Sequence, residues 1–186
     1  YDITRAEQDA YAIRSYQNTA LNTENGVFSN EIVGVSVPQR RGEPRLILED
    51  EEYKNVKFEK IPQLRAAFSP TGTVTAANAS TMNDGAAALI LASATAVKKY
   101  DLKPLAKILS FADTAHESAW FTTAPTHAAP KALALAKLAV TDVDYFEVNE
   151  AFSVVPLAFN KILNIDINKV NVYGGAVSLG HPLGAS

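Results

Sequence analysis

The sequence predicts a layered α/β fold, and two observations lead to this prediction. The second half of the chain alternates apolar, strand-like runs with helical runs, which is typical of a sheet covered by helices. The composition, with 47% hydrophobic and 20% charged residues among 186, is that of a globular protein rather than a disordered one. A chain of this length can bury one sizeable core or two small lobes.

The first half is expected to contain one long helix, one strand and a loop-rich lobe. Thr4 and Glu7 have the spacing of a capping box, which predicts a helix from about Arg5 to Leu21. The β-branched run over residues 31–38 predicts a strand that ends at a proline, because proline cannot donate to a sheet ladder. Residues 39–80 are rich in charge, Pro and Gly, so we expect loops there.

The second half begins with a small-residue and aliphatic run that suits a strand buried on both faces. A conflict arises at Pro156, because a proline inside a helix removes a hydrogen bond unless it lies in the first turn. We therefore expect the last helix to start late, near Ser153, or to be kinked. The expected elements are strands over residues 84–93, 104–113, 143–148 and 169–175, and helices over residues 94–101, 130–140 and 151–163.

Charge and composition limit the classes of partner. Seventeen Lys and Arg against twenty Asp and Glu give a net charge of -3, so nothing indicates a nucleic acid or an anionic membrane as partner. No apolar run is long enough to span a bilayer, and the first residues lack the pattern of a signal peptide, so we expect a soluble chain with a small-molecule partner. Cysteine is absent, which excludes disulfides, thiolate zinc sites and a thiol nucleophile within these residues.

Asn149 and Glu150 lie where the strand predicted over residues 143–148 meets a helix. In α/β sheets, ligands gather at the carboxyl ends of strands. An amide there can donate to an oxygen or hold a water, and a partly buried carboxylate must be hydrogen-bonded, which fixes its neighbours. The structural alternative is an Asn helix cap followed by a first-turn Glu that complements the helix dipole. Taken alone, the pair favours that alternative.

His181 follows a flexible, glycine-rich stretch and precedes Pro182, which suits the first turn of a helix. Glycines permit close approach of the backbone to a ligand, as where amides face a developing negative charge. The spacing matches neither phosphate-loop fingerprint, and a glycine-rich turn with a surface histidine explains the pattern equally well. The glycines are Gly174, Gly175, Gly180 and Gly184. A solvated or core position is preferred for His116 and His127.

Two further signals are weaker. The small residues around Asn78 and Ser80 leave backbone carbonyls and a hydroxyl free to line a narrow channel or a cation, although a tight loop-to-sheet junction explains them equally well. Lys57 and Lys60 could meet phosphates, but a solvated lysine face is the more common outcome.

The segments VNEAF and NVYGGAVSLGHPLGAS resemble the two C-terminal signature blocks of the thiolase family, and GTVTAANASTMNDGAAAL resembles the segment that leads into its C-terminal half. The resemblance covers essentially the whole chain and is strongest for the acetyl-CoA acetyltransferase branch. It implies a thiolase-like layered α/β fold, with residues 1–80 as a portion of the loop domain and residues 81–186 as an incomplete C-terminal half. The N-terminal part and the C-terminal end of the family are expected to be missing from this chain.

The resemblance implies that the intact protein reversibly condenses two acetyl-CoA molecules to acetoacetyl-CoA and CoA through an acyl-cysteine. Both family cysteines would lie outside these residues, so the chain itself is expected to be inactive. Asn149 matches an Asn that orients a water, and His181 matches a His that forms an oxyanion hole with that water. The alternatives are a degradative 3-ketoacyl-CoA thiolase for longer chains, and a thiolase-like protein that binds acyl-CoA or lipid without catalysis.

The resemblance also implies ligand contacts. Lys60 and Ser80 match positions that contact coenzyme A, Tyr16 matches a tyrosine near the same ligand in a potassium-responsive subgroup, and Phe121 lies in a segment that matches an acyl pocket. A potassium ion would be surrounded by Tyr16 and by carbonyls that match Ala76, Ala77, Ala79 and Val177. A homotetramer, a role in lipid metabolism such as the mevalonate pathway, and a cytoplasmic location are implied as well, with mitochondria or peroxisomes as alternative compartments.

Overall fold

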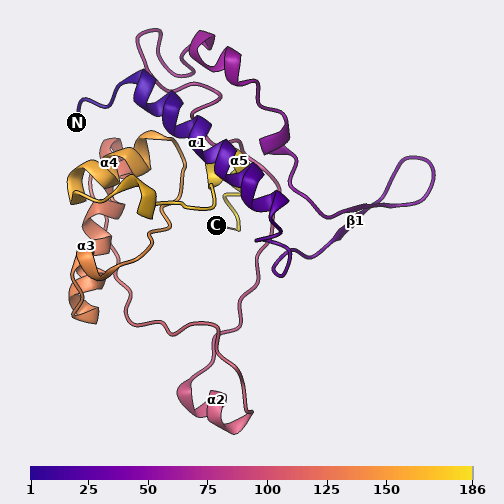
Figure 1. Cartoon of the computed structure of the whole chain (residues 1–186), viewed down its shortest axis with the longest axis vertical. Helices are drawn as coiled ribbons and strands as arrows, with labels where there is room; N and C mark the ends of the chain where they lie inside the picture. Colours follow the sequence, from indigo (N-terminus) through magenta and orange to yellow (C-terminus); the bar gives the residue numbers. More distant parts are fainter. Residues whose placement is uncertain (186) are drawn as a thin grey trace.

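Helix α1 (Arg5–Glu24) is the first element of the computed structural model, which describes residues 1–185. The predicted capping box closes its start, because the amide of Glu7 donates to the Thr4 hydroxyl at 3.2 Å and the amide of Thr4 donates to Glu7 Oε2 at 2.6 Å. The predicted helix is confirmed and ends at Glu24 rather than near Leu21. Figure 1 shows α1 lying across the molecule, where it packs against α5 (Ala176–Leu179) from the other end of the chain.

Strands β1 (Val35–Val37) and β2 (Arg45–Ile47) form an antiparallel hairpin that projects from the rest of the molecule (Figure 1). The strand predicted over residues 31–38 is therefore correct only for its second half. Both strands are largely exposed, so no buried face favours a longer pairing. The loop-rich lobe that follows contains only two 3-10 helices, η1 (Glu52–Lys54) and η2 (Phe58–Gln63).

The strands predicted over residues 84–93 and 104–113 do not form. Both segments are unpaired stretches that lead to and from α2 (Ala94–Lys99), which lies away from the other helices (Figure 1). Leu89 and Ile90 are 90% and 94% exposed. A buried strand needs hydrogen-bonded neighbours, and residues 1–185 supply none to these two segments. The helix predicted over residues 94–101 is confirmed.

Helices α3 (Pro125–Ala136) and α4 (Val154–Leu163) pack against each other. The helix predicted over residues 130–140 begins earlier, because the fixed φ of Pro125 suits a first helical position. It ends before Lys137, whose φ is 59°. Helix α4 starts after Ser153, so Pro156 lies in its first turn and the expected late start is confirmed.

The strands predicted over residues 143–148 and 169–175 are reduced to isolated bridges, of which one joins Phe146 to Val170. With no further strand beside them in the described part of the chain, the ladder stays short. These segments nevertheless form a core with α4, in which Val148, Val155, Phe159 and Val170 are buried together. The remaining short helices are η3 (Ser118–Thr123), η4 (Val140–Asp142) and η5 (Ile167–Lys169). Over residues 1–185, no helix combines the length and apolarity needed to cross a membrane.

Candidate active site

Asn149 and His181, the two residues expected to act in catalysis, meet in the structure. Nδ2 of Asn149 lies 3.0 Å from Nε2 of His181, although the two residues come from separate sequence blocks. Asn149 is exposed and His181 is partly buried, so both side chains lie at the surface of the chain. The amide donates to the ring when the neutral histidine carries its proton on Nδ1.

The backbone around His181 explains its position. The amide of His181 donates to the carbonyl of Thr81 at 2.8 Å. Gly180 has a φ of 91°, and a Cβ there would lie 2.3 Å from the side chain of Asn83, so only glycine fits. The stretch before His181, expected to be flexible, instead forms the short helix α5. Residues 183–185 form a turn, so the helix expected after Pro182 does not start within the described residues.

The position of Asn149 is fixed by hydrogen bonds to the backbone of the preceding residue, Val148. The side chain of Asn171 imitates a strand neighbour, because its Oδ1 accepts from the amide of Val148 and its Nδ2 donates to the carbonyl of Val148, both at 2.7 Å. Asn171 has a φ of 47°, a conformation that Asn tolerates better than most residues. This pairing replaces the missing ladder at the point where the site begins.

Glu150 is fully buried and accepts four hydrogen bonds. Oε1 accepts from the Tyr11 hydroxyl at 2.7 Å and from Nδ2 of Asn171 at 2.8 Å, and Oε2 accepts from the Ser15 hydroxyl at 2.7 Å and from the amide of Val177 at 3.0 Å. Burial, followed by the neighbouring carboxylate, raises the pKa of Tyr11, so its phenol stays protonated and donates. The first-turn alternative for Glu150 is wrong, because α4 begins only at Val154.

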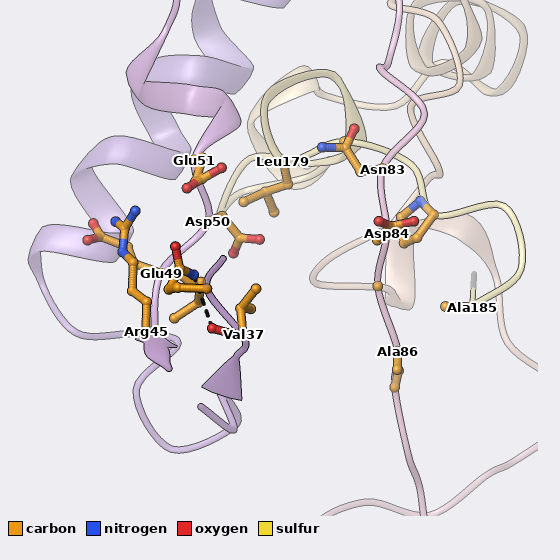
Figure 2. Close-up of a pocket in the computed structure, with 16 residues that line it drawn as sticks. Val37, Arg45, Glu49, Asp50, Glu51, Asn83, Asp84, Ala86, Leu179 and Ala185 are labelled. Carbon is orange, nitrogen blue, oxygen red and sulfur yellow. Dashed lines mark hydrogen bonds between the residues drawn. The ribbon is translucent and has the colours of Figure 1, made fainter. Parts of the chain in front are cut away.

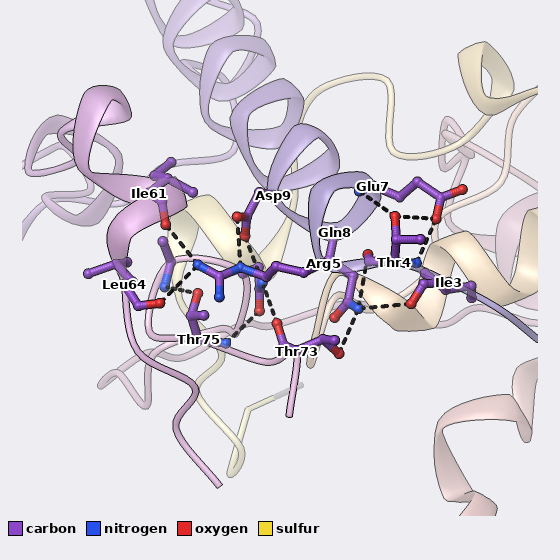
Figure 3. A network of polar contacts seen from close by, with 12 residues as sticks. Ile3, Thr4, Arg5, Glu7, Gln8, Asp9, Ile61, Leu64, Thr73 and Thr75 are labelled. Carbon is purple, nitrogen blue, oxygen red and sulfur yellow. Dashed lines mark hydrogen bonds and ion pairs between the residues drawn. The ribbon is translucent and has the colours of Figure 1, made fainter. Parts of the chain in front are cut away.

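The small-residue loop around Asn78 and Ser80 is hydrogen-bonded to the segment that carries Asn149 and Glu150. The Ser80 hydroxyl and amide both donate to the carbonyl of Ala151 at 3.0 Å. Figure 3 shows the polar network below α1, in which Arg5 donates to Oδ2 of Asp9 at 2.7 Å. The fully buried Asn78 donates to Oδ1 of the same residue at 2.8 Å. The loop therefore forms a tight junction between α1 and the segment that carries Asn149.

Of the residues expected to contact coenzyme A or a cation, the structure brings Tyr16 and Val177 together. Tyr16 and Val177 are buried in one cluster with Ala12. Burial, followed by the nearby Glu52 and Glu150 carboxylates, raises the pKa of Tyr16 to about 12. Lys60 is exposed on η2. Within residues 1–185, no hydrogen bond reaches the carbonyls of Ala76, Ala77, Ala79 and Val177.

A cavity of about 660 Å³ lies beside the site, and neither Asn149 nor His181 lines it. Figure 2 shows Glu49, Asp50 and Glu51 on one side of it and Asn83 and Asp84 on the other. Burial raises the pKa of Asp50, and Glu49 adds to this. Four carboxyl groups outnumber the single guanidinium, that of Arg45, around this cavity and disfavour phosphate, so the cavity does not suit the phosphates of coenzyme A.

Several contacts in the structure are not predicted by any local sequence pattern. No motif marks Tyr11 and Ser15 as partners of Glu150, although their spacing places both on one face of α1. His116 and His127 come together with ring centroids 5.0 Å apart. No third His, Cys, Asp or Glu completes a metal site with them among the residues that the structure describes.

Comparison with protein families identifies the chain. The family model described as "Thiolase, N-terminal domain" matches residues 1–95, and "Thiolase, C-terminal domain" matches residues 102–186. The chain therefore belongs to the thiolase family.

Several relatives at about 50% identity share one name. Acetyl-CoA acetyltransferase of Schizosaccharomyces pombe is 52% identical over the whole chain, the cytosolic enzyme of that name from Gibberella zeae is 50% identical, and the mitochondrial one from Bos taurus is 54% identical. The chain covers 47%, 47% and 44% of these proteins. It thus spans about half the length of the relatives it matches.

Solved structures confirm the predicted thiolase-like α/β fold. A thiolase from Ascaris suum in complex with coenzyme A matches all of this chain with a TM-score of 0.93 and 48% identity, over 47% of its own length. Human mitochondrial 3-ketoacyl-CoA thiolase matches 99% of the chain with a TM-score of 0.93 and 39% identity, over 46% of its own length.

Proposed function

We propose that this chain is part of an acetyl-CoA acetyltransferase, in which it supplies the oxyanion-binding side of the catalytic site. The observation that carries the proposal is the 3.0 Å contact between Asn149 and His181. The name shared by relatives at about 50% identity supports the same branch of the family. The proposed reaction condenses two acetyl-CoA to acetoacetyl-CoA and CoA, and its reverse is thiolysis.

In the proposed reaction, the acetyl group is carried on a cysteine from outside these residues, since the chain contains none. A second cysteine from outside these residues, acting as the base, takes a proton from the α-carbon of the second acetyl-CoA, and the resulting enolate attacks the acyl carbon. A C–C bond forms, and the cysteine thiolate leaves. Negative charge develops on the thioester oxygen of the enolate, where preorganised donors are most effective.

His181 and a water held by Asn149 are the proposed donors to that oxygen. Only a proton on Nε2 lets His181 donate to it. With the Asn149 amide in the flipped orientation, its oxygen takes the place of Nδ2 and accepts from Nε2–H of His181 while no substrate is bound. When substrate binds, the hydrogen bond between Asn149 and His181 is replaced by two hydrogen bonds to the thioester oxygen. One comes from Nε2–H of His181 and the other from the water held by Asn149.

Tyr16, Lys60 and Ser80 are proposed to contact coenzyme A. Lys60 is exposed and can reach a phosphate, and Ser80 is fastened to the segment that carries Asn149. A potassium ion would be held by Tyr16 and the carbonyls of Ala76, Ala77, Ala79 and Val177. The four carbonyls fit a cation because none of them accepts a hydrogen bond within residues 1–185. Such an ion would order the loop that leads to Ser80.

The remaining parts of the proposal concern the complete protein. Residues 1–80 would belong to the loop domain and residues 81–186 to the C-terminal half. The complete protein would be a homotetramer that acts on acetyl-CoA in the mevalonate pathway. Its compartment would be the cytoplasm or the mitochondrion, because relatives of both locations are about equally similar.

Thiolysis of acetoacetyl-CoA by the complete protein tests the function. His181→Ala should lower kcat by about 10²- to 10³-fold, the cost of one oxyanion donor. His127→Ala, which removes an exposed histidine on α3, is the matched control and should keep full activity. Unchanged turnover in His181→Ala contradicts the proposal.

The same assay with Na⁺ in place of K⁺ tests whether the proposed potassium ion is needed. Binding of coenzyme A by the complete protein without turnover would support the alternative of a non-catalytic thiolase-like protein.

A degradative 3-ketoacyl-CoA thiolase is the second candidate, because the human enzyme of that name has the same fold over this chain. The two candidates would use the same residues and differ in the size of the acyl pocket. A profile of thiolysis against acyl chain length separates them. Activity confined to the four-carbon substrate supports the first candidate, and activity on long chains supports the second.

A further inference from the structure

The carboxylate of Glu150 joins three separate parts of the chain. Each of its oxygens accepts one hydrogen bond from α1 and one from the C-terminal segment. Oε1 binds Tyr11 and Asn171, and Oε2 binds Ser15 and the amide of Val177. All four partners are donors, which suits an acceptor-only carboxylate. No cation lies within 4 Å of this carboxylate in the described part of the chain.

The backbone at Gly174 and Gly175 lies very close to the Glu150 carboxylate and to α1. A Cβ on Gly175 would lie 2.5 Å from Cδ of Glu150. Gly174 has a φ of 95°, and a Cβ on it would lie 1.9 Å from the hydroxyl oxygen of Thr19. The two glycines therefore let the loop before α5 lie directly on Glu150 and α1.

The same carboxylate is linked to both candidate catalytic residues. Asn149 is its neighbour in sequence. The amide of Val177, which it binds, belongs to the single turn of α5 that ends just before Gly180 and His181. A shift of the carboxylate would therefore move the backbone on both sides of the contact between Asn149 and His181.

We propose that Glu150 is a positioning residue, which holds Asn149 and His181 at the separation needed for oxyanion binding by fastening their two segments to α1. This inference rests on the proposed function. Tyr11 and Ser15 contribute to this positioning, because their hydroxyls hold the carboxylate against α1. A misplacement of about 1 Å can lower a rate about 10²-fold, so the cluster has a large effect without touching substrate.

Three variants of the complete protein test the inference. Glu150→Gln keeps the shape but places an amide donor against the Val177 amide or the Asn171 amide. Tyr11→Phe and Ser15→Ala each remove one donor and are milder, so they serve if Glu150→Gln fails to fold. Tyr53→Phe is the matched control, because Tyr53 donates to a carboxylate, that of Glu49, at the surface.

Two measurements are made on each variant: kcat and KM for thiolysis of acetoacetyl-CoA, and the separation of Asn149 Nδ2 and His181 Nε2 in crystal structures. We expect Tyr11→Phe and Ser15→Ala to lower kcat about 10-fold or more with KM changed less than about 2-fold, and the separation to exceed 3.5 Å. Tyr53→Phe should change neither.

Equal kcat in Tyr11→Phe and Tyr53→Phe, or a rise in KM alone, overturns the inference. If the complete wild-type protein has no thiolysis activity, the proposed function fails, and the crystal structures still decide about positioning. A separation that stays within 3.5 Å in every variant then overturns the inference by itself.

Discussion

At the scale of single residues, Gly175 shows how little space surrounds the Glu150 carboxylate. Gly175→Ala would place a Cβ 2.5 Å from Glu150 Cδ and 2.7 Å from both oxygens, and four hydrogen bonds prevent the carboxylate from moving aside. We expect the complete protein to lose about 1–3 kcal/mol of unfolding free energy, the usual cost of overpacking.

A shift of the urea-unfolding midpoint measures this loss. Gly184→Ala is the matched control, because no atom of the described residues 1–185 lies within 4 Å of its Cβ position and its φ is not in the left-handed region. It should change the midpoint little. An equal shift in both variants would mean that the space around Glu150 does not limit the fold.

Residues that lie in short, recognisable sequence blocks were the predictable part of the site. Asn149 and His181 were found because each lies in a short block with a recognisable pattern, and the structure brings them to 3.0 Å. Tyr11 and Asn171 were missed because their partner lies far away along the chain, and no local pattern encodes such a contact. The role of Glu150 was predictable only in part, because burial of its carboxylate implied hydrogen bonds but did not identify the residues that donate them.

At the scale of elements, the two helices α1 and α4 start in different ways. Thr4 caps α1 through the capping box, whereas the hydroxyl of Ser153 at the start of α4 is buried without a hydrogen-bond partner in the described residues. Pro156 explains the difference, because proline offers no amide to the hydroxyl three residues before it. The hydroxyls of Thr4 and Ser153 therefore contribute differently to the free energy of unfolding.

Thr4→Ala should lower the unfolding free energy by about 1 kcal/mol, the typical value of a helix cap. Ser153→Ala should leave it unchanged or raise it, because an unsatisfied buried hydroxyl is itself unfavourable. Thermal unfolding of the two variants beside the wild type measures both effects. A loss of stability in Ser153→Ala as large as that in Thr4→Ala would show that its hydroxyl does have a partner.

Helices were more predictable than strands for a physical reason. The start of α1 depends on Thr4 and Glu7, and the start of α4 on Pro156, which are local features of the sequence. A strand depends on a neighbour elsewhere in the chain. Residues 84–93 and 104–113 have the composition of buried strands, but residues 1–185 contain no segment paired with them, so they remain extended and exposed.

At the scale of the whole molecule, apolar side chains on these two segments are the most unusual feature of the surface. Leu89, Ile90 and Leu105 are almost fully exposed, and Phe111 is 81% exposed. Soluble monomers rarely expose contiguous apolar surface of this kind. An unpaired, extended and apolar segment is also a template for pairing with another chain.

The 186-residue chain expressed alone should therefore self-associate and bind an apolar fluorescent dye at micromolar concentration. Ile90→Glu should reduce both effects, because a charge in the middle of the apolar run opposes strand pairing between copies. Thr95→Glu is the matched control, since it adds the same charge on the exposed surface of α2 and leaves the apolar run intact. Sedimentation and dye fluorescence measure the outcome. A monomeric chain that binds no dye, or an equal effect of both substitutions, would show that the run over residues 86–91 does not cause association.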